Sequence, residues 1–94
     1  MTYAEIGKDI GALVDRKNRA YGDSFTKSGE VLKILYPNGV NLGEFKTLLA
    51  VTRIIDKLFR IATDKNAFDE APWTDIAGYA LLMVGDNGRE DKSK

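Results

Sequence analysis

Hydrophobic residues recur every three or four positions along most of the chain, which is the spacing of amphipathic α-helices. The stretch from Met1 to Tyr21 carries its apolar residues on one face: Tyr3, Ile6, Ile10, Leu13 and Val14. The same stripe continues through Lys17, and a second stripe, from Phe45 to Phe59, passes through Asp56. Burying an unpaired charge is costly for a small domain, so we expect both residues to be paired, to bind a ligand or to line a pocket.

Turn and capping residues divide the chain into four predicted helices, which begin near Met1, Thr26, Asn41 and Asp69 and end near Tyr21, Tyr36, Thr63 and Gly85. Gly22 suits a left-handed C-terminal cap after the first helix. Asn41 and Glu44 have the spacing of a capping box, which would open the third helix. We therefore predict an all-α fold, with one four-helix bundle-like domain over residues 1–85 and a charged flexible tail over residues 86–94.

The fourth predicted helix is apolar on almost every side, with Asp75 and Gly78 as the main interruptions. A helix of this kind lies either at the centre of its own domain or half buried against a second chain. Because 94 residues provide one small core, we favour the second arrangement. Homo-oligomerisation is therefore expected to complete the bundle.

Composition removes several classes of function. Lys and Arg total 14, as do Asp and Glu, and no basic tract occurs, so nonspecific DNA binding through a positive field is not expected. The absence of cysteine and histidine excludes thiolate zinc sites, disulfides and His-activated nucleophiles. No apolar run is long enough to span a bilayer, and Glu5, Lys8 and Asp9 interrupt any signal-peptide core. We expect a cytoplasmic protein that does not bind membranes.

The segment from residue 17 to residue 25 is the first candidate binding site. It combines a cation, an amide, a phenol, a hydroxyl and an aromatic ring, contributed by Lys17, Asn18, Tyr21, Ser24 and Phe25. A phosphate or a nucleobase could use the charge, the backbone amides of the next helix start and the ring. The alternative is an ordinary helix end with basic residues favoured by the helix dipole, although that alternative does not explain Lys17 on the apolar stripe.

A second candidate set lies on the third helix, where Asp56 points inward and Arg53 and Arg60 flank it. An intrahelical ladder of ion pairs that includes Lys57 is the structural alternative. It accounts well for Lys57 and less well for Asp56 and Arg60, which could pair with Lys17 or receive a ligand.

Carboxylates provide a third candidate site, because Mg²⁺ requires clustered oxygen ligands. The candidate ligands are Asp56, Asp69, Glu70 and Asp75. Asp69 and Glu70 fit equally well as favourable charges at the start of a helix.

Three segments, residues 17–25, 53–61 and 73–80, together resemble the motif blocks of nucleotide modification associated domains, which are small and often phage-encoded. That family is similar to the all-α MazG-like nucleoside triphosphate pyrophosphohydrolases, which bind Mg²⁺ through acidic clusters and form oligomers. The MazG pattern has a Glu-Glu-x-x-Glu run, whereas this chain has Glu30 followed three residues later by Lys33. The resemblance therefore implies nucleotide binding more directly than it implies hydrolysis.

Two functional hypotheses follow. The favoured one is a non-catalytic homo-oligomer that binds, and thereby sequesters, a phosphate-containing nucleotide-derived ligand such as an immune signalling nucleotide, without a cofactor. The alternative is a Mg²⁺-dependent nucleotide pyrophosphohydrolase that uses the four carboxylates and a metal-bound water. A structural oligomer without a ligand is the third and simplest reading.

Overall fold

The computed structural model describes the backbone of residues 1–64 and 71–93, with side chains described as far as Asp86. Its helices are α1 (Tyr3–Ala20), α2 (Ser24–Leu35), the 3-10 helix η1 (Leu42–Glu44), α3 (Phe45–Asp64) and α4 (Pro72–Ser93). No strand occurs in the described part of the chain. The predicted all-α fold is thus confirmed.

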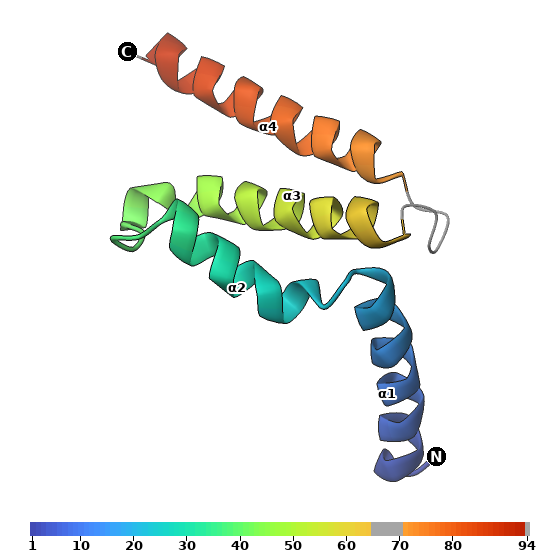
Figure 1. The fold of residues 1–94 in the computed structure, drawn as a ribbon. Coiled ribbons are helices and arrows are strands. Elements are labelled where there is room, and N and C mark those ends of the chain that lie inside the picture. Colours follow the sequence, from blue (N-terminus) through green and yellow to red (C-terminus); the bar gives the residue numbers. More distant parts are fainter. Residues whose placement is uncertain (65–70, 94) are drawn as a thin grey trace.

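Helix α3 occupies the middle of the molecule, with α2 along one side of it and α4 along the other (Figure 1). Helix α1 leaves this layer at an angle and meets the other helices only near its C-terminal end. The molecule is accordingly elongated, with principal extents of 54 × 29 × 29 Å. The described helices form a three-helix layer with a projecting fourth helix, and the completion of a bundle by further copies stays a prediction.

The junction between α1 and α2 fixes the direction in which α1 projects. Gly22 and Asp23 both adopt left-handed backbone conformations, with φ of 64° and 57°. The Asp23 amide donates to the Asn18 carbonyl at 2.9 Å, which closes the end of α1. A Cβ at Gly22 would collide with Oγ1 of Thr63 at the end of α3. The predicted left-handed cap at Gly22 is confirmed, and α2 begins at Ser24, before the predicted start.

Two predicted helix signals are wrong. Asn41 makes no side-chain capping bond, and its carbonyl instead accepts from the Glu44 amide at 3.1 Å in the 3-10 turn that precedes α3. Gly85 does not end α4, which continues to Ser93. An interior glycine costs a helix only about 1 kcal/mol, and the next residue, Asp86, pairs with Lys46 of α3 at 2.9 Å, which holds this part of α4 against its neighbour.

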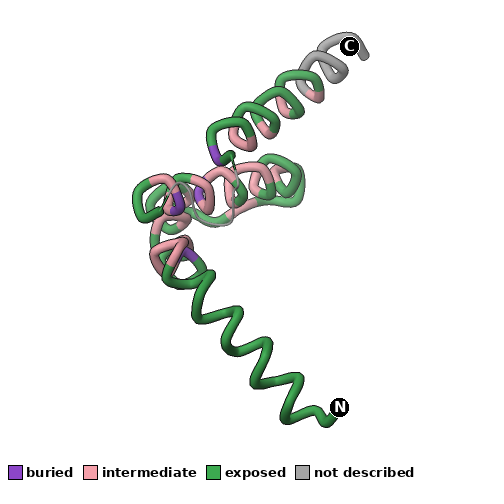
Figure 2. The backbone as a smooth tube through the Cα atoms, turned by 90° about the vertical axis from the view of Figure 1, so that its right-hand side faces the viewer, coloured by how far each residue is buried: buried purple, intermediate pink, exposed green. Residues whose placement is uncertain are grey.

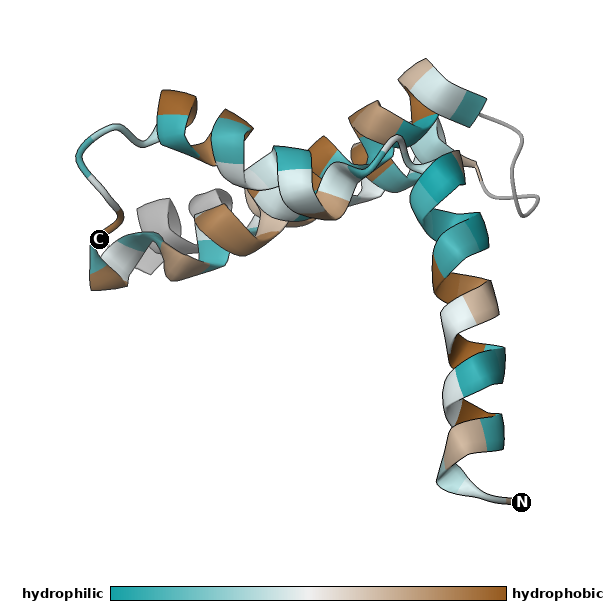
Figure 3. Ribbon diagram, turned by 60° about the horizontal axis from the view of Figure 1, so that its bottom comes forward, coloured by the Kyte–Doolittle hydropathy of each residue, from teal (hydrophilic) through white to brown (hydrophobic). Residues whose placement is uncertain are grey.

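Burial is sparse in the described part of the chain. Ile55 of α3, 5% exposed, is the only hydrophobic residue there that is fully buried. Every residue from Tyr3 to Arg19 is exposed, and Figure 2 shows α1 in the exposed colour along its length. Figure 3 shows hydrophobic residues recurring along the same helix. The first apolar stripe therefore faces solvent, and Lys17 is an exposed cation rather than a buried one, whereas Asp56 is half buried.

Among the described residues, none of the helices combines the length and the apolar content needed to cross a lipid bilayer.

Candidate functional site

A cavity of about 340 Å³ opens where α1, α2 and α3 meet. Its lining residues are Leu13, Val14, Lys17, Asn18, Tyr21, Ser24, Phe25 and Asp56. Six of these were candidate ligand-binding residues on sequence grounds. The two additions, Leu13 and Val14, come from the apolar stripe and give the cavity a hydrophobic wall.

Three different elements bring these side chains together. The α1 contribution comes from positions 13, 14, 17 and 18, whose spacing places them on one helical face, and from Tyr21, which caps the end of the helix. The left-handed turn at Gly22 and Asp23 then presents Ser24 and Phe25, the first two residues of α2. Asp56 reaches the cavity from the middle of α3. The local turn geometry therefore explains the walls that α1 and α2 form, and the packing of α3 against these helices supplies the third wall.

The N-terminus of α2 lies at this cavity. Asp23 precedes the helix without a side-chain capping bond, and the first helical amide to find an acceptor is that of Lys27, at 3.1 Å from the Asp23 carbonyl. The three earlier amides have no carbonyl of their own helix to bond. Ser24 is buried, at 4% exposure, whereas Phe25 is 92% exposed. The cavity thus meets the positive end of a helix and an open aromatic ring.

The cavity is chemically mixed. Lys17 provides a positive charge and Asp56 a negative one, and the Asn18 amide and the Tyr21 hydroxyl both donate and accept. Lys17 is suited to an anionic group such as phosphate, and Asp56 to hydroxyl or amino donors. The Phe25 ring offers a stacking surface. Such a set can recognise a ligand that carries an anion, hydrogen-bond donors and a flat ring.

Arg53 and Arg60, the other two predicted ligand-binding residues, lie elsewhere. The Arg53 guanidinium sits 5.6 Å from the centre of the Tyr79 ring, where α3 faces α4. Arg60 is fully buried near the end of α3 and does not line the cavity. Neither arginine is therefore among the residues that line the cavity.

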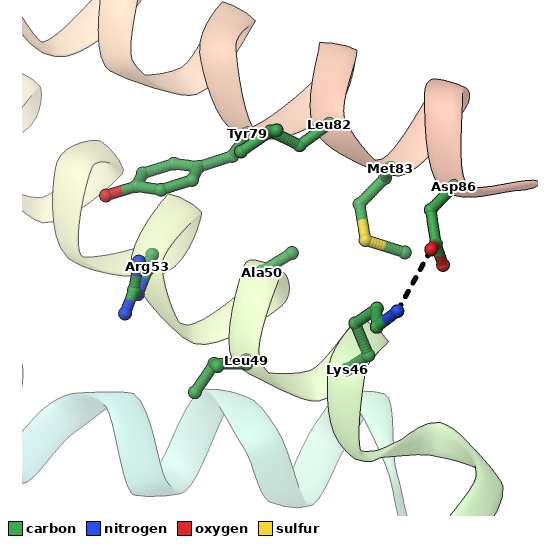
Figure 4. A pocket seen from close by; sticks show the side chains of 8 residues that line it. All are labelled: Lys46, Leu49, Ala50, Arg53, Tyr79, Leu82, Met83 and Asp86. Carbon is green, nitrogen blue, oxygen red and sulfur yellow. Dashed lines mark hydrogen bonds and ion pairs between the residues drawn. The ribbon is translucent and has the colours of Figure 1, made fainter.

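A second hollow, the α3–α4 groove, lies between those two helices and has a volume of about 280 Å³ (Figure 4). It is lined by Lys46, Leu49, Ala50, Arg53, Tyr79, Leu82, Met83 and Asp86. Figure 4 shows the Lys46–Asp86 pair at one end and Arg53 with Tyr79 at the other. The pattern of the sequence did not predict this groove. The spacing of Lys46, Ala50 and Arg53 on one face of α3 was visible in the sequence, but their opposition to α4 arises only from packing.

The candidate metal ligands do not converge in the described residues. Asp75 pairs with Lys57 at 3.2 Å, and Asp56 lines the cavity between α1, α2 and α3. Asp69 and Glu70 lie outside the described residues. Within the described ranges, no three Asp, Glu, His or Cys side chains are grouped so that they could hold a metal ion.

No protein-family model matches the chain, and neither a curated protein nor a solved structure matches it.

Proposed function

We propose that the cavity between α1, α2 and α3 binds a nucleotide-type ligand, namely an aromatic base that carries at least one phosphate. One observation carries this proposal: side chains from three helices place a cation, hydrogen-bonding groups and an exposed ring around one hollow of about 340 Å³. That volume lies at the lower end of the range for small-molecule sites, roughly 300–1,000 Å³. The resemblance to nucleotide modification associated domains supports the same ligand class.

Each side chain has a distinct role in this proposal. The Lys17 ammonium and the free amides at the start of α2 bind the phosphate. Phe25 stacks on the base, and its 92% exposure makes its ring accessible to a flat ligand. Asp56 accepts hydrogen bonds from sugar hydroxyls or from a base amino group, while Asn18 and Tyr21 complete the polar wall.

We favour binding without turnover, so that the protein sequesters its ligand. Asp56 is the one carboxylate among the described residues that line the cavity, whereas metal-assisted hydrolysis of a triphosphate requires several carboxylates around Mg²⁺. The MazG-like resemblance supports the alternative, a Mg²⁺-dependent nucleotide pyrophosphohydrolase with Asp56, Asp69, Glu70 and Asp75 as ligands.

We also propose that the protein works as a homo-oligomer. Large apolar side chains remain exposed on α1, α2 and α4 in the single chain, including Ile34 at 79%, Leu81 at 73% and Val84 at 68%. Such surfaces are unfavourable in water, and their burial against further copies would supply the hydrophobic stabilisation that one chain lacks.

The proposal is tested first by heating the purified protein and identifying the released small molecules by mass spectrometry. Calorimetry with a panel of nucleoside mono-, di- and triphosphates then follows, in EDTA and in MgCl₂. We expect saturable binding of at least one nucleotide, equal affinity in both buffers and recovery of the ligand intact. Pyrophosphate release that requires Mg²⁺ would establish the hydrolase instead, and failure of every nucleotide to bind would reject this function for the cavity.

A further inference from the structure

We propose that the α4 helices of two copies pack antiparallel across a twofold axis, with Leu81 of each copy seated over Gly78 of the other. This contact rests on the proposed homo-oligomer and is independent of the proposed ligand. The outer face of α4, which turns away from α3, exposes large apolar side chains: Trp73 at 63%, Leu81 at 73% and Val84 at 68%. A contact with a second copy would remove this apolar area from water.

The outer face of α4 carries no charge between residues 73 and 85. The helix contains one charged residue in that range, Asp75, and its carboxylate pairs with Lys57 of α3 at 3.2 Å. The next acidic residue, Asp86, pairs with Lys46 of α3 at 2.9 Å. Both carboxylates are thus held on the side that faces α3. Because a helix face in water ordinarily carries polar residues, the uncharged outer face is suited to contact with another protein surface.

Along the centre of the outer face runs a stripe of four residues, Thr74, Gly78, Leu81 and Gly85, at spacings of four, three and four. This is the spacing of the contact positions in a coiled coil. All four are exposed and line a hollow of about 530 Å³ on α4. A Cβ at Gly78 or Gly85 would meet nothing within 4 Å in the single chain. The hollow is therefore space that side chains of a second helix can fill.

The stripe is complementary to itself when two copies run antiparallel. A twofold axis that passes between residues 79 and 80 places Leu81 of each copy opposite Gly78 of the other. The same axis places Thr74 opposite Gly85. Each contact then joins a larger side chain to a glycine, so the two helix axes can approach to about 8 Å, the short end of the usual range. This match identifies a second copy of α4 as the occupant of the hollow.

A parallel pair does not have this match. It would place each residue opposite its own copy, so that Gly78 faces Gly78 and Leu81 faces Leu81. The leucines would then hold the helices apart and leave voids at the glycines, which is unfavourable. Parallel packing would also align the two helix dipoles, whereas antiparallel packing opposes them.

The α4 contact is one part of the proposed assembly. Residues 74–85 span about 18 Å of helix, and a helix is about 10 Å wide. A contact of that size is smaller than the roughly 800 Å² that each partner buries in a typical stable complex. The exposed apolar faces of α1 and α2 are left for further contacts between copies.

Exchange of the two opposed residues tests the register. Gly78→Leu alone opposes two leucines, and Leu81→Gly alone leaves a void, so each should raise the concentration of half-dissociation about tenfold or more. The double variant keeps one leucine and one glycine at each contact and should assemble within about threefold of the natural chain. Gly78→Leu strengthens the helix itself whereas Leu81→Gly weakens it, so a loss shared by both does not come from helix stability. Light scattering over a dilution series measures assembly, and circular dichroism checks the helices.

Disulfide trapping tests the direction of the two helices, because the natural chain has no cysteine. A chain with both Thr74→Cys and Gly85→Cys should form a covalent dimer on mild oxidation. Neither single variant should do so, because each position lies opposite the other one in an antiparallel pair. The two positions are about 16 Å apart along one helix, too far for a disulfide within a chain.

The α4 contact is contradicted if the double Gly78→Leu, Leu81→Gly variant assembles as poorly as the single variants. Cross-linking of the single cysteine variants as fast as the double one would assign a parallel pair instead. Equal assembly of every variant would show that the oligomer uses other faces of the chain, so the proposed homo-oligomer would stand without this contact. A natural chain that stays monomeric at every concentration would remove both together.

Discussion

Lys17 stands at the wall of the cavity as an exposed cation, even though its stem continues an apolar stripe. Lys17→Met removes the ammonium and keeps most of the stem. We expect nucleotide affinity to fall by about 1.5–3 kcal/mol, the range for a hydrogen bond to a charged group. Because the residue is exposed, the free energy of unfolding should change by no more than about 0.5 kcal/mol. Calorimetry with whichever nucleotide binds in the panel above measures the affinity, and thermal melts measure the stability.

Lys8→Met is the matched control for this prediction, since Lys8 is exposed on the same helix and does not line the cavity. It should leave affinity unchanged. If Lys17→Met destabilises the protein and Asp56→Leu restores stability in the double variant, Lys17 is a structural partner of Asp56 rather than a ligand-binding residue.

Individual residues also show what the sequence could and could not predict about the site. Five of the six predicted residues that share the cavity belong to one continuous segment, from Lys17 to Phe25, so helical spacing and one turn suffice to group them. Arg53 and Asp56 are only three residues apart, yet they line different hollows. Which side of α3 meets α2 and which meets α4 is set by packing across the molecule, and periodicity in α3 alone does not reveal it.

At the scale of the elements, the turn between α1 and α2 determines both the cavity and the direction of α1. Gly22→Ala should destabilise the fold by more than about 1–2 kcal/mol, the cost of a left-handed conformation for an L-residue. The additional cost comes from the collision of the new methyl group with Oγ1 of Thr63. Urea unfolding followed by circular dichroism measures the difference.

Gly39→Ala separates these two costs. Gly39 also has a positive φ, 84°, but a Cβ there would meet nothing within 4 Å. It should therefore show the conformational cost alone. Equal losses of stability at the two glycines would mean that Gly22 is not held tightly against α3.

Helix boundaries show a related division between local and tertiary effects. The left-handed cap at Gly22 was predictable because a single residue with a special backbone conformation ends α1. Gly85 resembles such a cap in sequence, but α4 passes through it, and the adjoining Asp86 pairs with Lys46, forty residues earlier in the chain. A contact of that kind has no local sequence signal. The end of α1 was therefore predicted correctly because one residue sets it, whereas the end of α4 was not, because a distant contact is involved.

At the scale of the whole molecule, periodicity identified the helices and their apolar faces, but it did not identify what covers those faces. In the described part of the chain α2, α3 and α4 form a layer from which α1 projects, and the predicted completion of a bundle by further copies stays a prediction. Several apolar side chains that a closed bundle would bury, Leu13 and Leu49 among them, are at least 40% exposed. A chain with so little buried surface gains much of its stability from assembly if further copies cover those faces.

Stability that depends on assembly should depend on protein concentration. For a dimer whose chains unfold on separation, a hundredfold dilution removes about 2.7 kcal/mol per dimer, or about 1.4 kcal/mol per chain. For a domain of this size that loss lowers Tm by roughly 5–10 °C.

Ile10→Glu, which places a charge on the α1 stripe, should lower Tm and abolish its concentration dependence, whereas Ala12→Glu on the opposite face should behave as the natural chain does. Calorimetric melts over the hundredfold concentration range measure Tm for the natural chain and both variants, and light scattering of the same samples measures their size. A Tm that does not change with concentration for the natural chain would establish a stably folded monomer.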